Sequence, residues 1–311
     1  MKKAITVTMN PSLDKTITID KLIPYGLNRV KSSRLDPGGK GINVAKVLES
    51  FKVDTLISGL IAGEQGKTLK GFLQQSGMNF SFLEIAGDTR TNIKLVDVSE
   101  NKTTEINENG FSVSPQSLEQ YKEMFRAQLE DVSLAVLAGS LPPGIPADFY
   151  AECIEIAKSN GVLTILDADG EPLKAGIKAV PYAVKPNIHE LEAITGRRFQ
   201  SKNEVLAAAK ELLAAGIEIV IVSMGADGAI VADKNEAFAV ESWDADIKST
   251  VGAGDSMVGS LAYAILSGKS LYDIAKITTA AGTVTASKEG TQICTMSEVI
   301  ESLDKVTVKI L

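Results

Sequence analysis

The chain has 311 residues, 44% of them hydrophobic and 23% charged, which is enough for one large globular domain or two ordinary ones with a sizeable core. Its formal net charge of −7 argues against broad binding to nucleic acid or to acidic membranes, so an anionic ligand needs a local basic cluster. The two cysteines, Cys153 and Cys294, lack metal-ligand spacing, and a single histidine excludes a His-rich metal site. No apolar run approaches the ~18 residues of a membrane span, and the first nine residues lack the apolar core of a signal peptide, so we expect a cytoplasmic protein.

The first third of the chain predicts strands and helices of a main domain, interrupted by strands of a second sheet. Strands are expected at 4–9 and 55–60, and helices at 41–51 and 64–75. Alternating polar and apolar residues predict further strands, each with one open face, at 16–20, 29–36, 80–85, 92–98 and 103–107. We interpret these as a small β-sheet lid, formed by insertions at about 12–36 and 80–110.

From Ser114 onward, short buried strands alternate with helices. Ser114 and Pro115 suit the cap and first turn of a helix that reaches Leu129. Strands are expected at 134–138, 163–167, 183–185 and 217–223, with a helix at 148–159 and others between them. This rhythm predicts an α/β fold with three layers, a mostly parallel central sheet between helices. We find no internal repeat or linker, so we expect a single domain over 1–311.

The stretch at 249–259 reads STVGAGDSMVG and precedes an apolar run of helical spacing. It places glycines where a helix should begin, and Asp255 in the first turn. The unpaired N–H groups and the dipole of a helix start attract anions, and glycines let an anion approach the backbone. An anion cradle beside a carboxylate suits phosphate transfer to a hydroxyl. The alternative is a glycine turn followed by an acid that interacts only with the helix dipole.

Ligands bind beyond the carboxyl ends of the strands in open parallel sheets. Turn chemistry explains any one of the five polar loops expected there, but together they indicate a site. These loops read NPSLD at 10–14, DPGGKG at 36–41, GSLPPG at 139–144, KPNIHE at 185–190 and SMGADG at 223–228. A Walker A loop at 66–68 is excluded by Ile61, and a dinucleotide fingerprint after Gly252 is excluded by Met257.

Two segments resemble the signatures of the ribokinase-like (PfkB) carbohydrate kinases. They read GGKGINVA at 38–45 and VGAGDSMVG at 251–259. The segments NPSLD at 10–14, TRTNIK at 89–94 and KPN at 185–187 resemble the phosphosugar branch of this family, and the likeness covers essentially the whole chain. The resemblance implies a ribokinase-like domain with a β lid over the active site. It also implies a homodimer, because lids of this branch commonly pair.

The resemblance implies that ATP donates its γ-phosphoryl group to a sugar-phosphate hydroxyl. Asp255 is then the general base, and the N–H groups of Gly252, Ala253 and Gly254 form the anion hole. Residues suited to the sugar hydroxyls and the existing phosphate are Asp14, Arg29, Gly38, Gly39, Lys40, Asn43, Arg90 and Ser140. Arg29 is otherwise a solvated strand residue, and Ser140 an ordinary turn residue.

The resemblance also implies a set of ATP contacts and a Mg²⁺ cofactor. The residues expected at ATP are Lys185, Asn187, Ser223, Gly225, Gly228, Gly254, Gly282, Ala286 and Ser287. Close helix packing explains the last three equally well. Asn187 and Glu190 match the family's Asn-x-x-Glu element and are implied to influence Mg²⁺, directly or through water. We interpret His189, between them, as a solvated residue at a helix start.

Within that branch, the contexts at 36–48 and 104–109 are most similar to the kinases that act on fructose 1-phosphate. The resemblance therefore favours phosphorylation of its 6-hydroxyl to give fructose 1,6-bisphosphate. Tagatose 6-phosphate or fructose 6-phosphate is the alternative acceptor, because no motif separates the three. A non-catalytic sugar-phosphate sensor is disfavoured by the intact Asp255 and its glycines, and a nicotinamide-dependent oxidoreductase by Met257.

Overall fold

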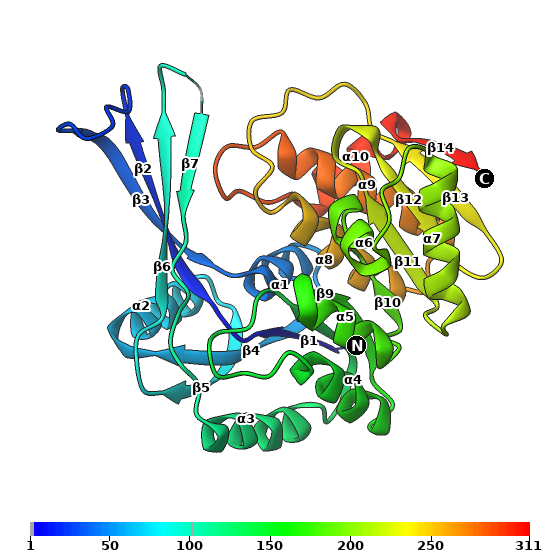
Figure 1. Cartoon of the computed structure of the whole chain (residues 1–311), viewed down its shortest axis with the longest axis horizontal. Coiled ribbons are helices and arrows are strands. Elements are labelled where there is room, and N and C mark those ends of the chain that lie inside the picture. The colour runs from blue at the N-terminus through cyan, green and yellow to red at the C-terminus, as the bar shows by residue number, and fades with distance from the viewer. Residues whose placement is uncertain (1–2, 101) are drawn as a thin grey trace.

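The computed structural model describes residues 3–100 and 102–311, which form one large and one small β-sheet (Figure 1). The strands of the large sheet are β1 (Lys3–Thr8), β4 (Asp54–Ala62), β5 (Asn79–Ile85), β8 (Val132–Ala138), β9 (Leu163–Asp167), β10 (Ala183–Val184), β11 (Ile219–Ser223), β12 (Ala229–Ala232), β13 (Ala237–Glu241) and β14 (Thr307–Ile310). Their order across the sheet is β14-β13-β12-β11-β10-β9-β8-β1-β4-β5. Pairing is parallel from β5 to β11 and antiparallel from β11 to β14.

Helices cover both faces of the large sheet. They are α1 (Lys40–Ser50), α2 (Gly63–Gln75), α3 (Pro115–Gln128), α4 (Phe149–Ser159), α5 (Gly170–Lys178), α6 (Ile188–Thr195), α7 (Lys202–Ala214), α8 (Ala253–Leu266), α9 (Leu271–Ala286) and α10 (Met296–Ser302). The core on one face includes buried side chains of α3, α4, α5 and α7. The core on the other face includes those of α1, α8, α9 and α10. The predicted α/β/α fold with a mostly parallel sheet is therefore confirmed.

None of the helices in residues 3–100 and 102–311 combines the length and the apolar character that a membrane span requires.

The small sheet stands away from the body of the molecule (Figure 1). It consists of β2 (Ser12–Ile19), β3 (Val30–Gly38), β6 (Arg90–Asp97) and β7 (Lys102–Ile106), in the order β3-β2-β6-β7. Strand β2 continues from β1 after a three-residue connection, and β3 leads directly to α1. The base of the small sheet is thus fixed to the edge where β1 ends.

Residues 80–85 were expected in the small sheet, but that prediction is wrong. They belong to β5, which pairs in parallel with β4 at the edge of the large sheet. Phe80 and Phe82 pack against the cluster of Leu69 and Leu73, and Leu83 and Ile85 pack against the core on the opposite face, but all four stay partly exposed at the sheet edge. An edge strand with partly exposed side chains on both faces can therefore resemble a strand of an open sheet. The second segment of the small sheet therefore begins at Arg90.

Helices α1 and α8 cross at very short range, because Gly259 offers no side chain. A Cβ atom at Gly259 would lie 2.7 Å from Cβ of Val47 and 3.1 Å from the carbonyl oxygen of Val44. This contact brings the N-terminal part of α1 close to the N-terminal part of α8. Asn43 of α1 and Asp255 of α8 are hydrogen-bonded across it.

We expect Gly259→Ala to lower the free energy of unfolding by about 1–2 kcal/mol, because the overpacking cost exceeds the gain in helix propensity. Gly71→Ala is the matched control: it lies inside α2, and a Cβ there would meet no described atom within 4 Å. That control should gain about 0.5–1 kcal/mol. Urea unfolding of both variants measures the difference, and equal effects would contradict the tight crossing.

Candidate active site

The polar loops predicted from the sequence gather at one edge of the large sheet. Parallel strands β1, β8, β9, β10 and β11 end at this edge, and helices α4, α5 and α6 follow β8, β9 and β10. Gly139, Lys185 and Ser223 stand at or just after three of these strand ends. The base of the small sheet and the N-terminus of α8 border the same region.

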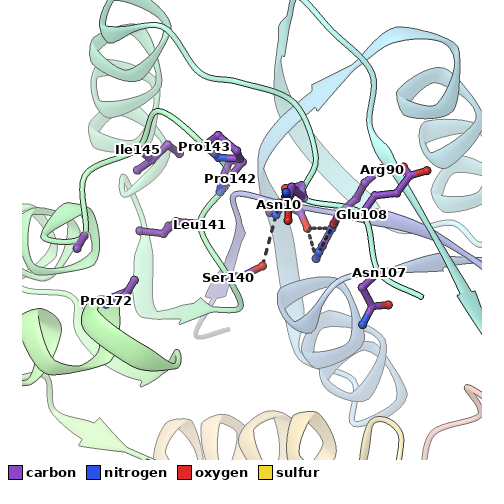
Figure 2. Close-up of a pocket in the computed structure, with 12 residues that line it drawn as sticks. Asn10, Arg90, Asn107, Glu108, Ser140, Leu141, Pro142, Pro143, Ile145 and Pro172 are labelled. Carbon is purple, nitrogen blue, oxygen red and sulfur yellow. Dashed lines mark hydrogen bonds between the residues drawn. The ribbon is translucent and has the colours of Figure 1, made fainter. Parts of the chain in front are cut away.

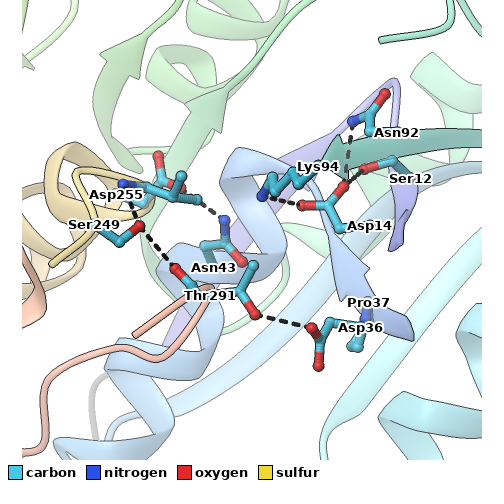
Figure 3. Close-up of polar contacts among 12 residues, drawn as sticks. Ser12, Asp14, Asp36, Pro37, Asn43, Asn92, Lys94, Ser249, Asp255 and Thr291 are labelled. Carbon is cyan, nitrogen blue, oxygen red and sulfur yellow. Dashed lines mark hydrogen bonds and ion pairs between the residues drawn. The ribbon is translucent and has the colours of Figure 1, made fainter. Parts of the chain in front are cut away.

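Asp255 is buried at the start of α8, where Gly252 occupies the N-cap with φ 78°, a conformation that favours glycine. Its Oδ2 accepts a hydrogen bond of 2.8 Å from Nδ2 of Asn43 (Figure 3). Burial raises the pKa of Asp255, and the negative charge of Asp167 adds to this, while Lys40, Asn43 and Lys185 act in the opposite direction. A carboxylate in this position can accept a proton beside a helix N-terminus that can hold an anion.

Asp167, at the end of β9, forms the centre of a buried charge cluster. Its Oδ1 lies 3.3 Å from Nζ of Lys40 and 3.5 Å from Nζ of Lys185. Burial opposes the charge of Asp167, but Lys185 and Lys40 outweigh it and hold its pKa below the usual range. Likewise, burial works against the ammonium of Lys40, yet Asp167 and Asp255 hold its pKa above the usual value.

Sequence reasoning missed Asp167. The available signal was its position as the last residue of a predicted strand in a parallel sheet, where side chains reach a ligand edge. Its Oδ2 is buried and has no hydrogen-bond partner among the described residues. Lys185 also lies close to the start of α8, since a Cβ at Gly254 would be 3.5 Å from its Nζ. The cluster therefore places two cations next to Asp255 and the predicted anion hole.

The inner end of the small sheet carries a second polar network. Lys94 donates to Oδ2 of Asp14 over 2.9 Å, and Oδ1 accepts from Asn92 at 3.2 Å and from Ser12 at 2.8 Å (Figure 3). Gly38 leaves room for this carboxylate, because a Cβ there would lie 2.6 Å from Cγ of Asp14. The predicted Asp14 is thus joined by Asn92 and Lys94, which the sequence analysis did not select. Asn92 and Lys94 are two residues apart, and alternate residues of a strand share one face, so their spacing could have indicated that both face the same site.

Arg90 and Ser140 line a cavity of about 530 Å³ beside this network (Figure 2). The guanidinium of Arg90 donates to the carbonyl oxygen of Asn10 through Nε and Nη2, and to that of Glu108 through Nη1. The side-chain amide of Asn10 donates to Oγ of Ser140 over 3.4 Å. Two of the residues predicted to bind the acceptor therefore come together at one cavity.

Arg29 lies apart from these acceptor candidates. It is exposed and immediately precedes β3, where Val30 pairs with Ile19. Asp14 pairs with Asp36 near the opposite end of the same hairpin. Within one chain, therefore, Arg29 is distant from Asp14, and its participation in a site stays a prediction.

A second cavity of about 550 Å³ lies along α8, α9 and the end of β11. Six of the residues predicted to contact ATP line it: Ser223, Gly225, Gly228, Gly254, Gly282 and Ala286. Gly282 also serves helix packing, because a Cβ there would lie 2.9 Å from Cγ of Met257. Trp243 and Ile247 line the cavity too, from a segment without regular structure that gave no sequence signal. Ser287 is the C-cap residue of α9.

Asn187 and Glu190 form a capping box at the start of α6. Oδ1 of Asn187 accepts from the Glu190 N–H at 2.9 Å, and Oε2 of Glu190 accepts from the Asn187 N–H at 2.7 Å. Burial raises the pKa of Glu190, although Lys40 and Lys185 favour its charge. Within the described part of the chain, no three His, Cys, Asp or Glu residues cluster as metal ligands. His189 is exposed in the first turn of α6.

We expect Asp167→Asn to lower the free energy of unfolding at pH 7 by about 3 kcal/mol, because it leaves the buried Lys185 and the partly exposed Lys40 without their shared carboxylate. A carboxyl whose pKa is lowered by folding stabilises the protein above its unfolded pKa of about 3.9 and loses this effect as the pH falls. The difference from wild type should therefore narrow below about pH 4 in urea unfolding.

The control is Asp20→Asn, which removes an ion pair with Lys31 between side chains that are 79% and 51% exposed. It should cost less than about 1 kcal/mol. Equal losses for both variants would contradict a buried charge cluster.

Comparison with known proteins gives a consistent result. A model of the pfkB family carbohydrate kinases matches residues 7–298. A 1-phosphofructokinase of Xanthomonas campestris is 39% identical over 85% of this chain and 84% of its own length. A 1-phosphofructokinase of Borreliella burgdorferi is 35% identical over 98% and 97%, respectively.

A solved structure of the tetrameric inhibited form of phosphofructokinase-2 from Escherichia coli superposes with a TM-score of 0.91 at 28% identity, covering 98% of this chain and 99% of that chain. The fold, both sequence signatures and the relatives therefore agree, and they confirm the resemblance found in the sequence. The protein belongs to the pfkB family of carbohydrate kinases.

Proposed function

We propose that the protein transfers the γ-phosphoryl group of ATP to the 6-hydroxyl of fructose 1-phosphate and forms fructose 1,6-bisphosphate and ADP. The observation that carries this proposal is the position of Asp255. It follows Gly254, which lines the cavity along α8 and α9, and it is hydrogen-bonded to Asn43, which belongs to the α1 side of the site. The name 1-phosphofructokinase of the two relatives supports the choice of acceptor.

Asp255 acts as the general base in this proposal. It takes the proton of the 6-hydroxyl while that oxygen forms a bond to the γ-phosphorus, and the bond to the β-phosphate oxygen breaks. The N–H groups of Gly252, Ala253 and Gly254 stabilise the charge that develops on the transferred group. The short distance between Lys185 and the start of α8 supports a role for this lysine at the ATP phosphates.

The acceptor is proposed to lie between α1 and the inner end of the small sheet, which serves as a lid. Asp14 and Asn43 suit sugar hydroxyls, because a carboxylate accepts hydrogen bonds and an amide both accepts and donates them. Gly38 and Gly39 allow a close approach to the backbone. Arg90, with Ser140, is the proposed partner of the existing phosphate, since guanidinium groups bind phosphate well and Arg90 borders a cavity. Lys40 supplies a further cation.

Mg²⁺ is the cofactor that this chemistry implies. Magnesium keeps several waters and binds through one or two carboxylates together with substrate phosphates. Glu190 fits such a role, because its hydrogen bond to the Asn187 N–H uses Oε2 and its carboxylate is near Lys40 and Lys185. Glu190 and Asn187 would hold the hydrated ion, which when bound neutralises charge on the phosphates.

We expect Asp255→Asn to lower kcat by at least about 10²-fold, because it removes the base, while acceptor binding is retained. Coupled spectrophotometric assays with ATP and Mg²⁺ measure this for fructose 1-phosphate, tagatose 6-phosphate and fructose 6-phosphate. Wild type should show its highest kcat/KM with fructose 1-phosphate. A preference for tagatose 6-phosphate would overturn the acceptor, and near-normal turnover of the variant would remove Asp255 from the base role.

We also propose that two copies pair through the small sheet. Six apolar side chains on this sheet and its connecting turns are each more than half exposed: Ile23, Tyr25, Leu27, Val30, Val98 and Ile106. Such a concentration is unusual on a monomer and typical of a protein interface. A homodimer would also bring the exposed Arg29 of one copy near the other copy's lid.

Leu27→Asp should reduce the mass measured by sedimentation velocity to that of a monomer, because it buries a charge in the proposed interface. Ile300→Asp is the control, since Ile300 is 55% exposed on α10, which belongs to the body of the molecule. It should leave the mass unchanged. An unchanged mass for Leu27→Asp relative to wild type would argue against pairing through the small sheet.

A further inference from the structure

Lys46 lies one helical turn after Asn43 on α1 and contacts two different parts of the site. Its Nζ donates to the carbonyl oxygen of Pro37 over 2.7 Å and to Oδ1 of Asn43 over 3.3 Å. Pro37 belongs to β3, so this lysine connects the helix to the small sheet. Neither the sequence signatures nor the proposed contacts with acceptor and ATP give it a role.

The contact between Lys46 and Asn43 determines which way the amide of Asn43 faces. An ammonium group only donates hydrogen bonds, so the amide oxygen must point toward Lys46. The amide nitrogen then points the other way, and it donates to Oδ2 of Asp255 over 2.8 Å. A carboxylate needs a donor, and an inverted amide would present an oxygen to it instead. Lys46 thus excludes the arrangement that would repel the charge of Asp255.

The surroundings of Lys46 are mostly acidic. Burial lowers the pKa of Lys46, while Asp36, Asp14 and Asp255 favour its charged form and Lys94 opposes it. Asp255 itself faces Asp167 of β9, Lys40 and Asn43 of α1, and Lys185 after β10. Lys46 is therefore one of three lysines whose charge favours the ionised form of Asp255, and the one that also contacts its hydrogen-bond donor.

We propose that Lys46 is a positioning residue for the phosphoryl transfer, which fixes the Asn43 amide so that it donates to Asp255 and joins α1 to β3 of the small sheet. This inference rests on the proposed function of Asp255 as the base. It differs from a purely structural role, in which Lys46 would stabilise the helix and strand without affecting how Asp255 ionises.

The test compares Lys46→Met, Asn43→Ala and the double variant. Lys46→Met should lower kcat by about tenfold, because a hydrogen bond to a charged group is disturbed, and should leave the KM for ATP within about twofold. The acid limb of its kcat–pH profile should move to higher pH. In the Asn43→Ala background the same change should cost less than about threefold, because residues that act through one another are not additive.

Lys46→Arg keeps both the charge and the donor, so it should retain kcat within about threefold of wild type. Lys122→Met is the control: this buried lysine of α3 contacts Glu119 and Glu152, away from the site. It should reduce stability without moving the pH profile. Additive losses in the double variant, or an unmoved acid limb in Lys46→Met, would overturn the proposal.

A readout that is independent of turnover separates this proposal from the proposed function. Protein labelled with ¹³C at the aspartate carboxyl carbon is titrated by NMR, and the Asp255 signal is assigned by its absence from Asp255→Asn. The pKa of Asp255 should be higher in Lys46→Met than in wild type, and not in Lys122→Met. If wild type phosphorylated none of the three acceptors, the proposed function would fail, while a raised pKa would still support the role of Lys46. An unchanged pKa would overturn that role.

Discussion

The ion cluster of Asp167, Lys40 and Lys185 is the constraint on which the rest of the site depends. A buried carboxylate is costly unless it is paired, and here two lysines from different segments converge on one of its oxygens. Because Lys40 opens α1 and Lys185 follows β10, pairing with Asp167 fixes the first turn of α1 relative to the carboxyl edge of the sheet. The same two cations lie near Asp255, so a single cluster influences both the geometry and the ionisation of the proposed base.

The crossing of α1 and α8 places the proposed base between the two halves of the proposed site. Gly259 lets the helices approach closely, and the hydrogen bond between Asn43 and Asp255 joins their first turns. Helix α1 lies on the proposed acceptor side, next to the Asp14 network. Helix α8 lies along the cavity that Gly254 and Gly282 line. Acceptor and nucleotide would therefore meet where the two helices begin, under the small sheet.

The sequence predicted the layers and most of the loops at the site, because buried apolar runs and glycine-rich turns depend on local chemistry. It did not select Asp167, Asn92 or Lys94 as site residues, because strand position alone does not reveal which residues of neighbouring strands and helices face them. Residues 80–85 were misassigned because an edge strand whose side chains stay partly exposed resembles a strand of an open sheet. Asn187 and Glu190 form a capping box at the start of α6, and their implied role with Mg²⁺ stays a prediction.

The most direct test of the account is the pH dependence of kcat for wild type and Asp167→Asn, with both substrates saturating. Comparing the two proteins cancels the titration of the acceptor's own phosphate. Burial and Asp167 both raise the pKa of Asp255, so the wild-type acid limb should lie above the range of an ordinary aspartate. Removing the charge of Asp167 should move that limb to lower pH. A limb that stays in place or moves to higher pH would contradict the central claim that this buried cluster sets the ionisation of the base.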